Sequence, residues 1–283
     1  MEHLTGFAPL ASRYDGFIID LWGVLHDGVS PYPGAVDVLA RLQAMGKRSV
    51  LLSNAPRRSF MAQRGMRAMG IADALYTDIL TSGEATHWML RDRTDPFFAG
   101  LGDRVYHLGP ERDRNVFEGL PITPVNRPDQ ATFLLNTGPD DDRSPTDPGP
   151  YMPELRACLA AGLPMVCANP DLEVIRGGVR LICAGTLAQC YEALGGVTRW
   201  IGKPDPAIYT PVVEMLGVPK HRVLAVGDAL RTDIAGATGV GIDACWVLGG
   251  IHGAELGGNP GAVEAAARQA GLAPVAAVPS FIW

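Results

Sequence analysis

The 283-residue sequence predicts an α/β protein: a doubly wound, Rossmann-like parallel sheet with a smaller α/β domain inserted into it. Three observations favour this class. Short apolar runs alternate with segments of helical period, which is typical of a parallel sheet covered by helices on both faces. The apolar runs are continuous, as expected for strands that are buried on both sides. This alternation of strand and helix patterns restarts after Gly100, and from "RWIGKPDP" it again resembles the alternation of the first hundred residues.

The first series begins with "GFIID" (Gly16–Asp20), an apolar run with β-branched residues at its centre. A loop punctuated by Gly and Pro leads to an expected helix over Ala35–Met45, where apolar residues recur at a helical period. The pattern then repeats. It predicts strands at "SVLLSN" (Ser49–Asn54) and "ALYTDIL", and helices at Arg58–Met69 and "GEATHWMLRD".

The second series occupies the middle of the chain. The stretch "GPDDDRSPTDPGP" is so rich in Pro and Asp that we expect an irregular loop there. Around it the pattern predicts helices at Met152–Ala161 and "GTLAQCYEALGG", and strands at "RVYHLG" (Arg104–Gly109), "ATFLLNT" (Ala131–Thr137) and "PMVCA".

The last series returns to the style of the first. It predicts helices at Pro206–Leu216 and Thr232–Gly239, and strands at "RVLAVGD" (Arg222–Asp228) and "IDACWVL". The simplest organisation is one sheet domain made of residues 1–98 and 198–283, interrupted by an inserted α/β domain over residues 99–197.

Composition and charge narrow the class of protein. The formal net charge of −6 and the pI of about 5.5 argue against a nucleic-acid or membrane-surface partner. No apolar run approaches the roughly 20 residues that span a bilayer, and the first residues lack the pattern of a signal peptide. The five cysteines form no CxxC pair, which favours reduced thiols. We therefore expect a cytoplasmic enzyme or binding protein.

Polar residues with one chemical theme follow four of the expected strands: Asp20, then Ser53 with Asn54, then Lys203, then Asp228 with Asp233. The loops at the carboxyl ends of strands meet in open α/β sheets. Carboxylates that converge there repel each other and are stable together only around cations, such as a lysine and a divalent metal ion. Mg²⁺ prefers oxygen ligands and commonly accompanies phosphate. Asp20 could then attack phosphorus, while Ser53 and Asn54 hold phosphate oxygens.

Each of these residues also has an ordinary structural interpretation. Aspartate, serine and asparagine after a strand often form turns or cap helices, and a lone lysine is commonly a surface residue. Lysine is rare here, however, with three among the 24 basic residues. A lysine between Gly202 and Pro204 suggests a site that needs a compact charge. The coincidence of four strand ends favours the chemical interpretation.

These motifs resemble those of the haloacid dehalogenase (HAD) superfamily, in the subgroup whose C2-type α/β cap lies between the second and third motifs (subfamily IIA). That subgroup includes NagD-like sugar phosphatases and the phosphoglycolate and nitrophenyl phosphatases. "FIIDLWGVLHDG", "LLSNAPRR", "IGKPDP" and "VGDALRTDIAGA" resemble its four motifs in order. The resemblance covers nearly the whole chain and implies a HAD core with an inserted C2 cap.

The resemblance implies a role for each matched residue. Asp20 is the expected nucleophile, and Lys203 steadies both nucleophile and phosphate. Ser53 and Asn54 are the expected phosphate-binding residues. Mg²⁺ is the expected cofactor, and its implied ligands are Asp20, the backbone carbonyl of Trp22 and Asp228, with Asp233 as a close partner just outside them.

One position departs from the family pattern. Phosphatases of this superfamily carry a second aspartate two residues after the nucleophile, which protonates the leaving oxygen and then activates water. Here that residue is Trp22, whose indole is a donor only and cannot transfer a proton at neutral pH. Acid–base catalysis of this kind is typically worth about 10²–10⁴-fold. Either the leaving group needs no proton, or another residue such as His26 or Asp27 substitutes, or turnover is slow.

The expected function is hydrolysis of a small phosphate monoester, such as a sugar phosphate, through an aspartyl phosphate at Asp20. The alternative is a phosphate-ligand binding or regulatory protein with little turnover, because Trp22 replaces the acid–base residue. A dehalogenase fits less well, since it would not use the acidic residues of "GDALRTD" as metal ligands. The inserted domain is expected to close over the substrate, and capped relatives imply that two copies pair through the cap.

Overall fold

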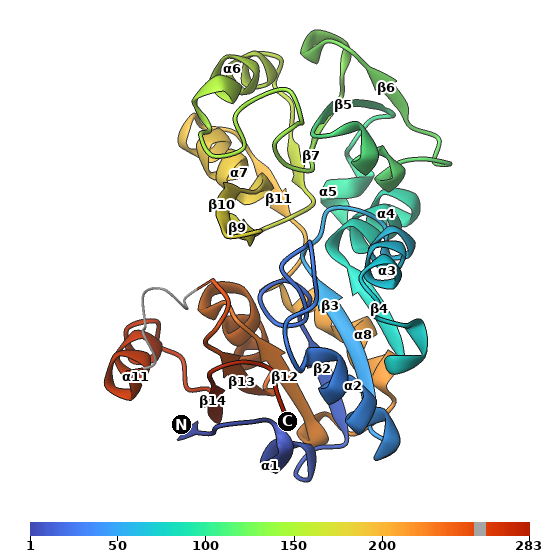
Figure 1. Ribbon diagram of the computed structural model, residues 1–283. Coiled ribbons are helices and arrows are strands. Elements are labelled where there is room, and N and C mark those ends of the chain that lie inside the picture. The colour runs from blue at the N-terminus through green and yellow to red at the C-terminus, as the bar shows by residue number, and fades with distance from the viewer. Residues whose placement is uncertain (252–258) are drawn as a thin grey trace.

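The computed structural model describes residues 1–251 and 259–283, and it confirms the expected α/β class. The described strands form two parallel sheets and one short antiparallel hairpin (Figure 1). The larger sheet lies in the lower part of Figure 1 and the smaller sheet in the upper part. The hairpin lies where the two parts meet, so it faces the loops that follow the strands of the larger sheet.

The larger sheet has the strand order β1-β14-β13-β12-β2-β3-β4, and its paired strands are parallel. Its central strands are the continuous apolar runs, which are buried almost throughout because helices cover both faces. The strands are β1 (Glu2–His3), β2 (Gly16–Ile19), β3 (Arg48–Ser53), β4 (Asp78–Thr81), β12 (Val223–Gly227), β13 (Asp243–Val247) and β14 (Ala276–Val278).

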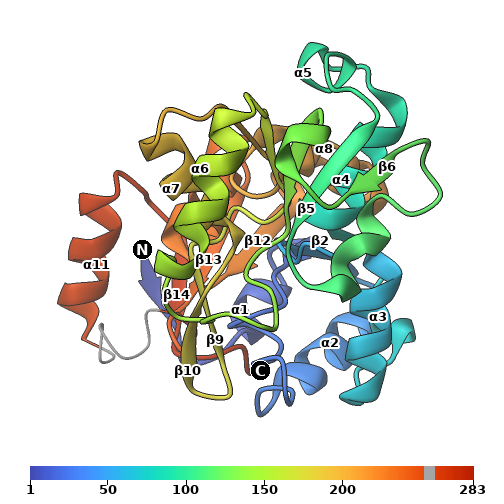
Figure 2. The same ribbon diagram turned by 90° about the horizontal axis from the view of Figure 1, so that it is seen from above.

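Helices cover the two faces of this sheet (Figure 2). Side chains alternate along a strand, so Phe17 and Ile19 of β2 pack in the cluster that includes α1, α2 and α3, whereas Ile18 packs in the cluster that includes α4, α8, α9 and α11. The helices are α1 (Ala8–Ala11), α2 (Ala35–Ala44), α3 (Ser59–Ala68), α4 (Ser82–Asp92), α8 (Tyr209–Leu216), α9 (Ala235–Gly239) and α11 (Pro260–Gln269).

The smaller sheet has the strand order β11-β8-β7-β5-β6, again with parallel pairs. One face shares a hydrophobic cluster with α4 and the larger sheet, and the other packs against α6 and α7. The elements are α5 (Pro96–Ala99), β5 (Arg104–Leu108), β6 (Thr123–Val125), β7 (Phe133–Asn136), α6 (Met152–Ala160), β8 (Met165–Cys167), α7 (Ala184–Ala193) and β11 (Thr198–Trp200). The domain limits at residues 98 and 198 stay a prediction; β11 lies just beyond the expected end of the insertion at residue 197.

The hairpin of β9 (Glu173–Arg176) and β10 (Val179–Ile182) was not among the expected elements. Its two-residue loop is Gly177–Gly178, and both glycines have positive φ, at 54° and 80°. That conformation suits the tight turns that join antiparallel strands. A Gly-Gly pair between two apolar runs is therefore the signal in the sequence that could have predicted this hairpin.

The strands β1, β6 and β14 and the helices α1, α5 and α11 were not expected either. Two of the expected elements differ in detail. The run "ALYTDIL" forms a strand only from Asp78 onward, because Asp73–Leu75 form a 3₁₀ turn first. The helix expected from Thr232 begins as a π-helical turn over Leu230–Ile234 and continues as α9. Among residues 1–251 and 259–283, no helix has both the length and the apolar character that crossing a membrane requires.

Candidate active site

The larger sheet brings four of the expected site residues together. Strands β2 and β12 are neighbours, with Ile19 paired to Val226, so the loops that carry Asp20 and Asp228 start side by side. Asp233 comes from the π-helical turn that follows β12. Lys203 reaches the same point from the segment after β11. The four side chains are buried, with exposed fractions of 8% for Asp20, 3% for Lys203, 6% for Asp228 and 5% for Asp233.

Lys203 ties this cluster together. Its Nζ donates hydrogen bonds to Oδ1 of Asp20 at 2.6 Å, to Oδ1 of Asp233 at 2.7 Å and to the carbonyl oxygen of Leu52 at 3.0 Å. An ammonium group has three donors, so each has a partner. Burial alone would lower the pKa of Lys203, but the carboxylates of Asp20 and Asp233 raise it well above its usual value. Lys203 is therefore a fixed positive charge beside Asp20.

The three carboxylates form a group that fits a hard cation. Asp20, Asp228 and Asp233 each offer an oxygen, and these oxygens lie within 4.8 Å of one another. Burial raises the pKa of Asp20 well above its usual value against the opposing effect of Lys203, and burial together with Asp233 raises the pKa of Asp228 to about 7. Three carboxylates against one ammonium leave an excess of negative charge, which a divalent ion would offset.

Two glycines allow the Asp228 carboxylate its position. A Cβ at Gly23, where φ is 78°, would lie 2.0 Å from Oδ2 of Asp228, and a Cβ at Gly250 would also lie 2.0 Å from it. The same carboxylate oxygen accepts a hydrogen bond from the backbone N–H of Ile251 at 2.7 Å. The loops after β2 and β13 therefore approach Asp228 closely only because these positions have no side chain.

Asn54 lies at the end of β3, and its side chain is used within the protein. Its Oδ1 accepts from the backbone N–H of Lys203 at 2.8 Å, and its Nδ2 donates to the carbonyl oxygen of Lys203 at 3.2 Å and to Oδ1 of Asp171 at 2.8 Å. Asp171 belongs to the segment that leads into the β9–β10 hairpin. The Asn54 amide thus joins the lysine segment to the upper part of the molecule, and its expected phosphate contact stays a prediction.

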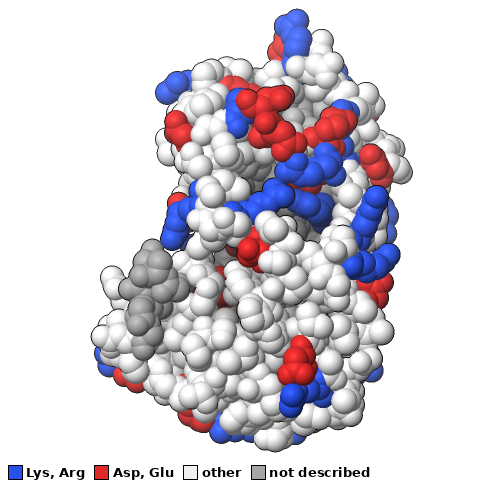
Figure 3. All heavy atoms as spheres, viewed as in Figure 1, with Lys and Arg blue, Asp and Glu red and all other residues white. Residues whose placement is uncertain are grey.

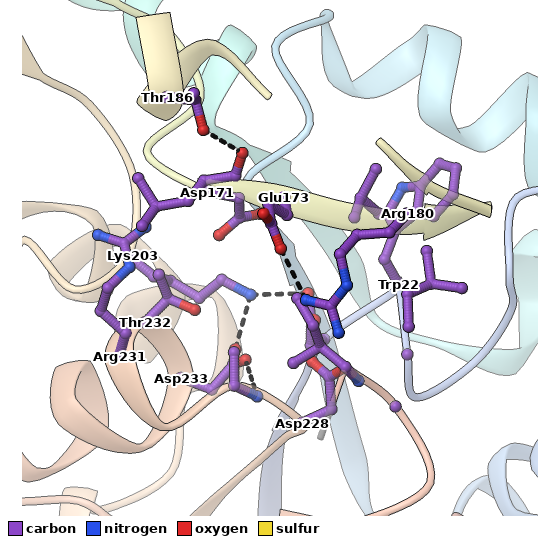
Figure 4. A pocket seen from close by; sticks show the side chains of 18 of the residues that line it. Trp22, Asp171, Glu173, Arg180, Thr186, Lys203, Asp228, Arg231, Thr232 and Asp233 are labelled. Atoms are coloured by element: carbon purple, nitrogen blue, oxygen red, sulfur yellow. Dashed lines mark hydrogen bonds and ion pairs between the residues drawn. The ribbon is translucent and has the colours of Figure 1, made fainter. Parts of the chain in front are cut away.

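Ser53 and Trp22 take different places around the cluster. Ser53 is buried, and its Oγ accepts from the backbone N–H of Ala55 at 3.2 Å. Among the described residues, none donates a hydrogen bond to the carbonyl oxygen of Trp22, and its expected metal contact stays a prediction. The Trp22 ring points upward from the carboxylates toward the hairpin (Figure 4). It packs against Gly28, where a Cβ would meet the indole at 2.0 Å, and edge-on against His26.

A cavity of about 520 Å³ opens above the cluster, between the larger sheet and the hairpin. Seen from the side in Figure 3, the molecule is hollowed at this level, and Lys and Arg side chains gather along the hollow. Its floor includes the four clustered residues. Residues that we did not single out as site residues from the sequence complete its wall, among them Tyr32, Glu173, Arg180, Thr186, Gln189 and Arg231. Thr186 and Gln189 come from α7, Arg231 comes from the π-helical turn, and Glu173 and Arg180 come from the hairpin. Because these elements are far apart in the sequence, no local motif predicted the wall.

Comparisons with known proteins agree with this arrangement. A family model described as haloacid dehalogenase-like hydrolase matches residues 17–123, and a second, HAD-hydrolase-like, matches residues 200–274. The crystal structure of a haloacid dehalogenase-like hydrolase from Brucella suis 1330 is 30% identical, with a TM-score of 0.85, and the match covers 99% of this chain and 100% of that one. The chain belongs to the HAD-like hydrolase family. The expected superfamily and fold are thereby confirmed.

Other HAD-like hydrolases to which the chain is similar carry more specific names. It is 28% identical to a D-glycerol 3-phosphate phosphatase of Mycobacterium tuberculosis over 87% of this chain, but spans only 66% of that enzyme's length. It is 26% identical to an acid sugar phosphatase of Staphylococcus aureus, over 84% of this chain and 88% of that enzyme. A glycerol phosphate phosphatase from M. tuberculosis, solved in complex with magnesium, is 28% identical with a TM-score of 0.64, over 85% of this chain and 70% of that one.

Proposed function

We propose that this HAD-like hydrolase cleaves small phosphate monoesters, of sugars or similar polyols, through an aspartyl phosphate at Asp20. One observation carries the proposal: a buried lysine bridges Asp20 and Asp233 beside Asp228, on the floor of the 520 Å³ cavity. An isolated cluster of buried carboxylates is costly without cations, so its presence beneath a cavity favours a catalytic role. The phosphatase names of the two curated relatives support the reaction class.

The chain's own residues suit the first chemical step. Asp20 accepts the lysine hydrogen bond on Oδ1, and no described residue donates to its other carboxylate oxygen, which can attack phosphorus. As that P–O bond forms, the bond to the leaving oxygen breaks, and the leaving oxygen takes up a proton. Water then attacks phosphorus, releases phosphate and restores Asp20. Lys203 stays charged throughout and offsets the charge on Asp20 and on the phosphoryl oxygens.

Mg²⁺ is the metal ion that we propose for this site. Asp20, Asp228 and the carbonyl of Trp22 would hold it, with Asp233 beside them on Lys203. The donor set consists of oxygen atoms only, which hard cations prefer. When bound, the ion supplies positive charge that stabilises the phosphoryl oxygens and the crowded carboxylates.

Phosphate release from glycerol phosphates, sugar phosphates and nitrophenyl phosphate, with Mg²⁺ present, tests the proposal. Asp20→Asn should abolish release and prevent formation of a phosphorylated protein. Asp27→Asn is the matched control, because Asp27 lies in the same loop but accepts from the backbone of Val29 and Ser30, a turn that asparagine also forms. Activity that survives in the Asp20 variant would remove Asp20 from the nucleophile role.

A second candidate is a phosphate-ligand binding protein with little turnover, which the tryptophan at position 22 favours. It predicts tight binding of phosphate compounds with negligible release in the same assay. Pairing of two copies through residues 99–197 and a cytoplasmic location also stay predictions, as does the absence of nucleic-acid and membrane partners. Sedimentation of the purified protein tests the pairing, by comparison with variants in which exposed residues of the 99–197 region are substituted.

A further inference from the structure

The β9–β10 hairpin forms the roof of the cavity above Asp20. Side chains alternate between the two faces of a strand, and Glu173, Ile175 and Arg180 fall on the face that lines the 520 Å³ cavity. Val174 and Leu181 of the opposite face line a second cavity of about 200 Å³, although Val174 also borders the first cavity and Ile182, opposite Glu173, borders the second. Glu173 and Arg180 line the first cavity and not the second. Glu173 and Arg180 are therefore directed from the hairpin toward the space that a leaving group would occupy (Figure 4).

Neither residue that the sequence offered as a substitute for the missing acid–base aspartate is suitably placed. His26 is buried, its Nδ1 accepts from the backbone N–H of Gly28 at 3.1 Å, and burial lowers its pKa to about 4. Asp27 is engaged in its own turn with Val29 and Ser30. Neither lines the cavity. The Trp22 loop therefore contributes a wall and no proton carrier.

Outside the floor cluster, two described carboxylates line the cavity, Asp171 and Glu173. Tyr32 also lines it, but burial raises the pKa of its phenol. Asp171 is committed through Oδ1 to the Asn54 amide, which itself holds Lys203. Glu173 is held from the side by Arg180, whose Nη1 lies 2.6 Å from its Oε2. That contact joins diagonal neighbours of the hairpin. Both side chains are partly exposed, at 43% for Arg180 and 39% for Glu173, and the contact places the Glu173 carboxyl group in the roof.

We propose that Glu173 performs the proton transfers that position 22 cannot, acting from the roof of the cavity rather than from the nucleophile's own loop. The inference rests on the proposed phosphatase function. In the first step Glu173, which carries a proton on Oε1 while Oε2 accepts from Arg180, gives that proton to the leaving oxygen as the P–O bond breaks. In the second, its carboxylate takes a proton from the water that attacks the aspartyl phosphate. Glu173 ends the cycle protonated, as it began, and the balance is monoester plus water to alcohol plus phosphate.

The dependence on the leaving group separates this role from a structural one. A nitrophenolate leaves without a proton, whereas an alkoxide does not. In Glu173→Gln, the first turnover of nitrophenyl phosphate should therefore keep its rate, while steady-state turnover falls by about 10²–10⁴-fold because water is no longer activated. The expected signature is a burst of one nitrophenol per active site, with phosphorylated protein detectable by mass spectrometry. Glycerol phosphate should show no burst and a loss of similar size.

Controls keep the outcomes distinct. Glu118→Gln alters an exposed glutamate of the same region that lines neither cavity, and should leave both rates unchanged. Thermal unfolding of Glu173→Gln checks that the variant folds. Three results would overturn the assignment to Glu173. Glu173→Gln could lose activity equally on nitrophenyl phosphate and glycerol phosphate without a burst, or lose none at all. The burst could also appear in Asp171→Asn instead. Absence of phosphatase activity in the unaltered protein would refute the proposed function itself, which is a separate result.

Discussion

Asn54 and Lys203 lie 149 residues apart in the chain, yet the amide of Asn54 holds both backbone groups of Lys203, at 2.8 Å for the N–H and 3.2 Å for the carbonyl. The same amide reaches Asp171 in the upper part of the molecule. A Cβ at the preceding Gly202 would lie 2.5 Å from Oδ1 of Asn54, so this contact needs a glycine there. One side chain thus couples the buried Lys203 to the segment that leads to the hairpin.

Asn54→Ala should lower kcat more than it changes KM. Without the amide, the backbone at Lys203 loses its anchor, and a small displacement of a catalytic group costs up to about 10²-fold in rate. Steady-state kinetics on nitrophenyl phosphate provide the measurement. Asn259→Ala, which removes only the N-terminal cap of α11, is the control for stability loss alone. An unchanged kcat in Asn54→Ala would show that Lys203 needs no anchor.

Lys203→Met should destabilise the protein by about 3–5 kcal/mol, because it leaves buried carboxylates without their cation. Lys203→Arg should not restore stability, since a planar guanidinium cannot replace a compact ammonium with three acceptors around it. Denaturant unfolding measures both. Lys47→Met is the control, because its ion pair with Asp15 is partly exposed and worth at most about 1 kcal/mol. Equal unfolding midpoints for Lys203→Met and the unaltered protein would contradict the role of this ion-pair cluster.

Mg²⁺ should stabilise the protein more at pH 8 than at pH 5. In the metal-free protein the pKa of Asp228 is raised to about 7, above its unfolded value of about 3.9. Between about pH 3.9 and about pH 7, the two pKa values of Asp228, the folded state binds more protons than the unfolded state does. The metal-free protein therefore loses stability as the pH rises through this range. Mg²⁺ binds the ionised carboxylates and therefore reverses this loss of stability. At a Mg²⁺ concentration 100 times the Kd, binding adds about 2.7 kcal/mol to the free energy of unfolding. Thermal unfolding in Mg²⁺ and in chelator, at both pH values, measures this difference; equal shifts would refute it.

Gly250→Ala should weaken Mg²⁺ binding by about 10–100-fold, as loss of a supporting contact around a metal ligand typically does. Its Cβ would lie 2.0 Å from Oδ2 of Asp228 and would displace that carboxylate. Isothermal titration with Mg²⁺ measures the affinity. Gly239→Ala is the matched control, because a Cβ there meets nothing within 4 Å. Binding that is as tight in Gly250→Ala as in the unaltered protein would show that Asp228 is not a ligand.

The sheet and the floor of the site could be predicted from the sequence because both depend on local signals. The central strands β2, β3 and β12 are continuous apolar runs, and each is followed by a polar residue, Asp20, Asn54 and Asp228 respectively. The carboxyl ends of neighbouring parallel strands meet, so Asp20 and Asp228 had to lie close together once β2 and β12 were paired. Lys203 stood out because lysine is rare among the basic residues of this sequence, with three among 24, which is a property of composition.

The roof of the site could not be predicted in the same way. Glu173 and Arg180 acquire their position from a hairpin that folds back over loops far away in sequence. The side chain of Asn54 was expected at phosphate, and nothing in the sequence indicated its contacts with the backbone of Lys203, 149 residues away, and with the Asp171 carboxylate. Such contacts depend on how the inserted part sits on the sheet, and no spacing or periodicity along the chain encodes that.

Adding Trp22→Asp to the Glu173→Gln variant should restore activity, because it places a carboxylate two residues after Asp20, the proposed nucleophile. The double variant should recover at least about tenfold in glycerol phosphate turnover over Glu173→Gln, part of the 10²–10⁴-fold that acid–base catalysis supplies. The loss of the half-buried indole costs packing against Gly28 and His26, so activity is compared at a temperature where both variants are folded. Trp22→Asn in the same background removes the same ring without adding a proton carrier. Equal recovery with Asn would assign the effect to space rather than to proton transfer, and no recovery with Asp would show that a carboxylate at position 22 cannot reach the leaving oxygen.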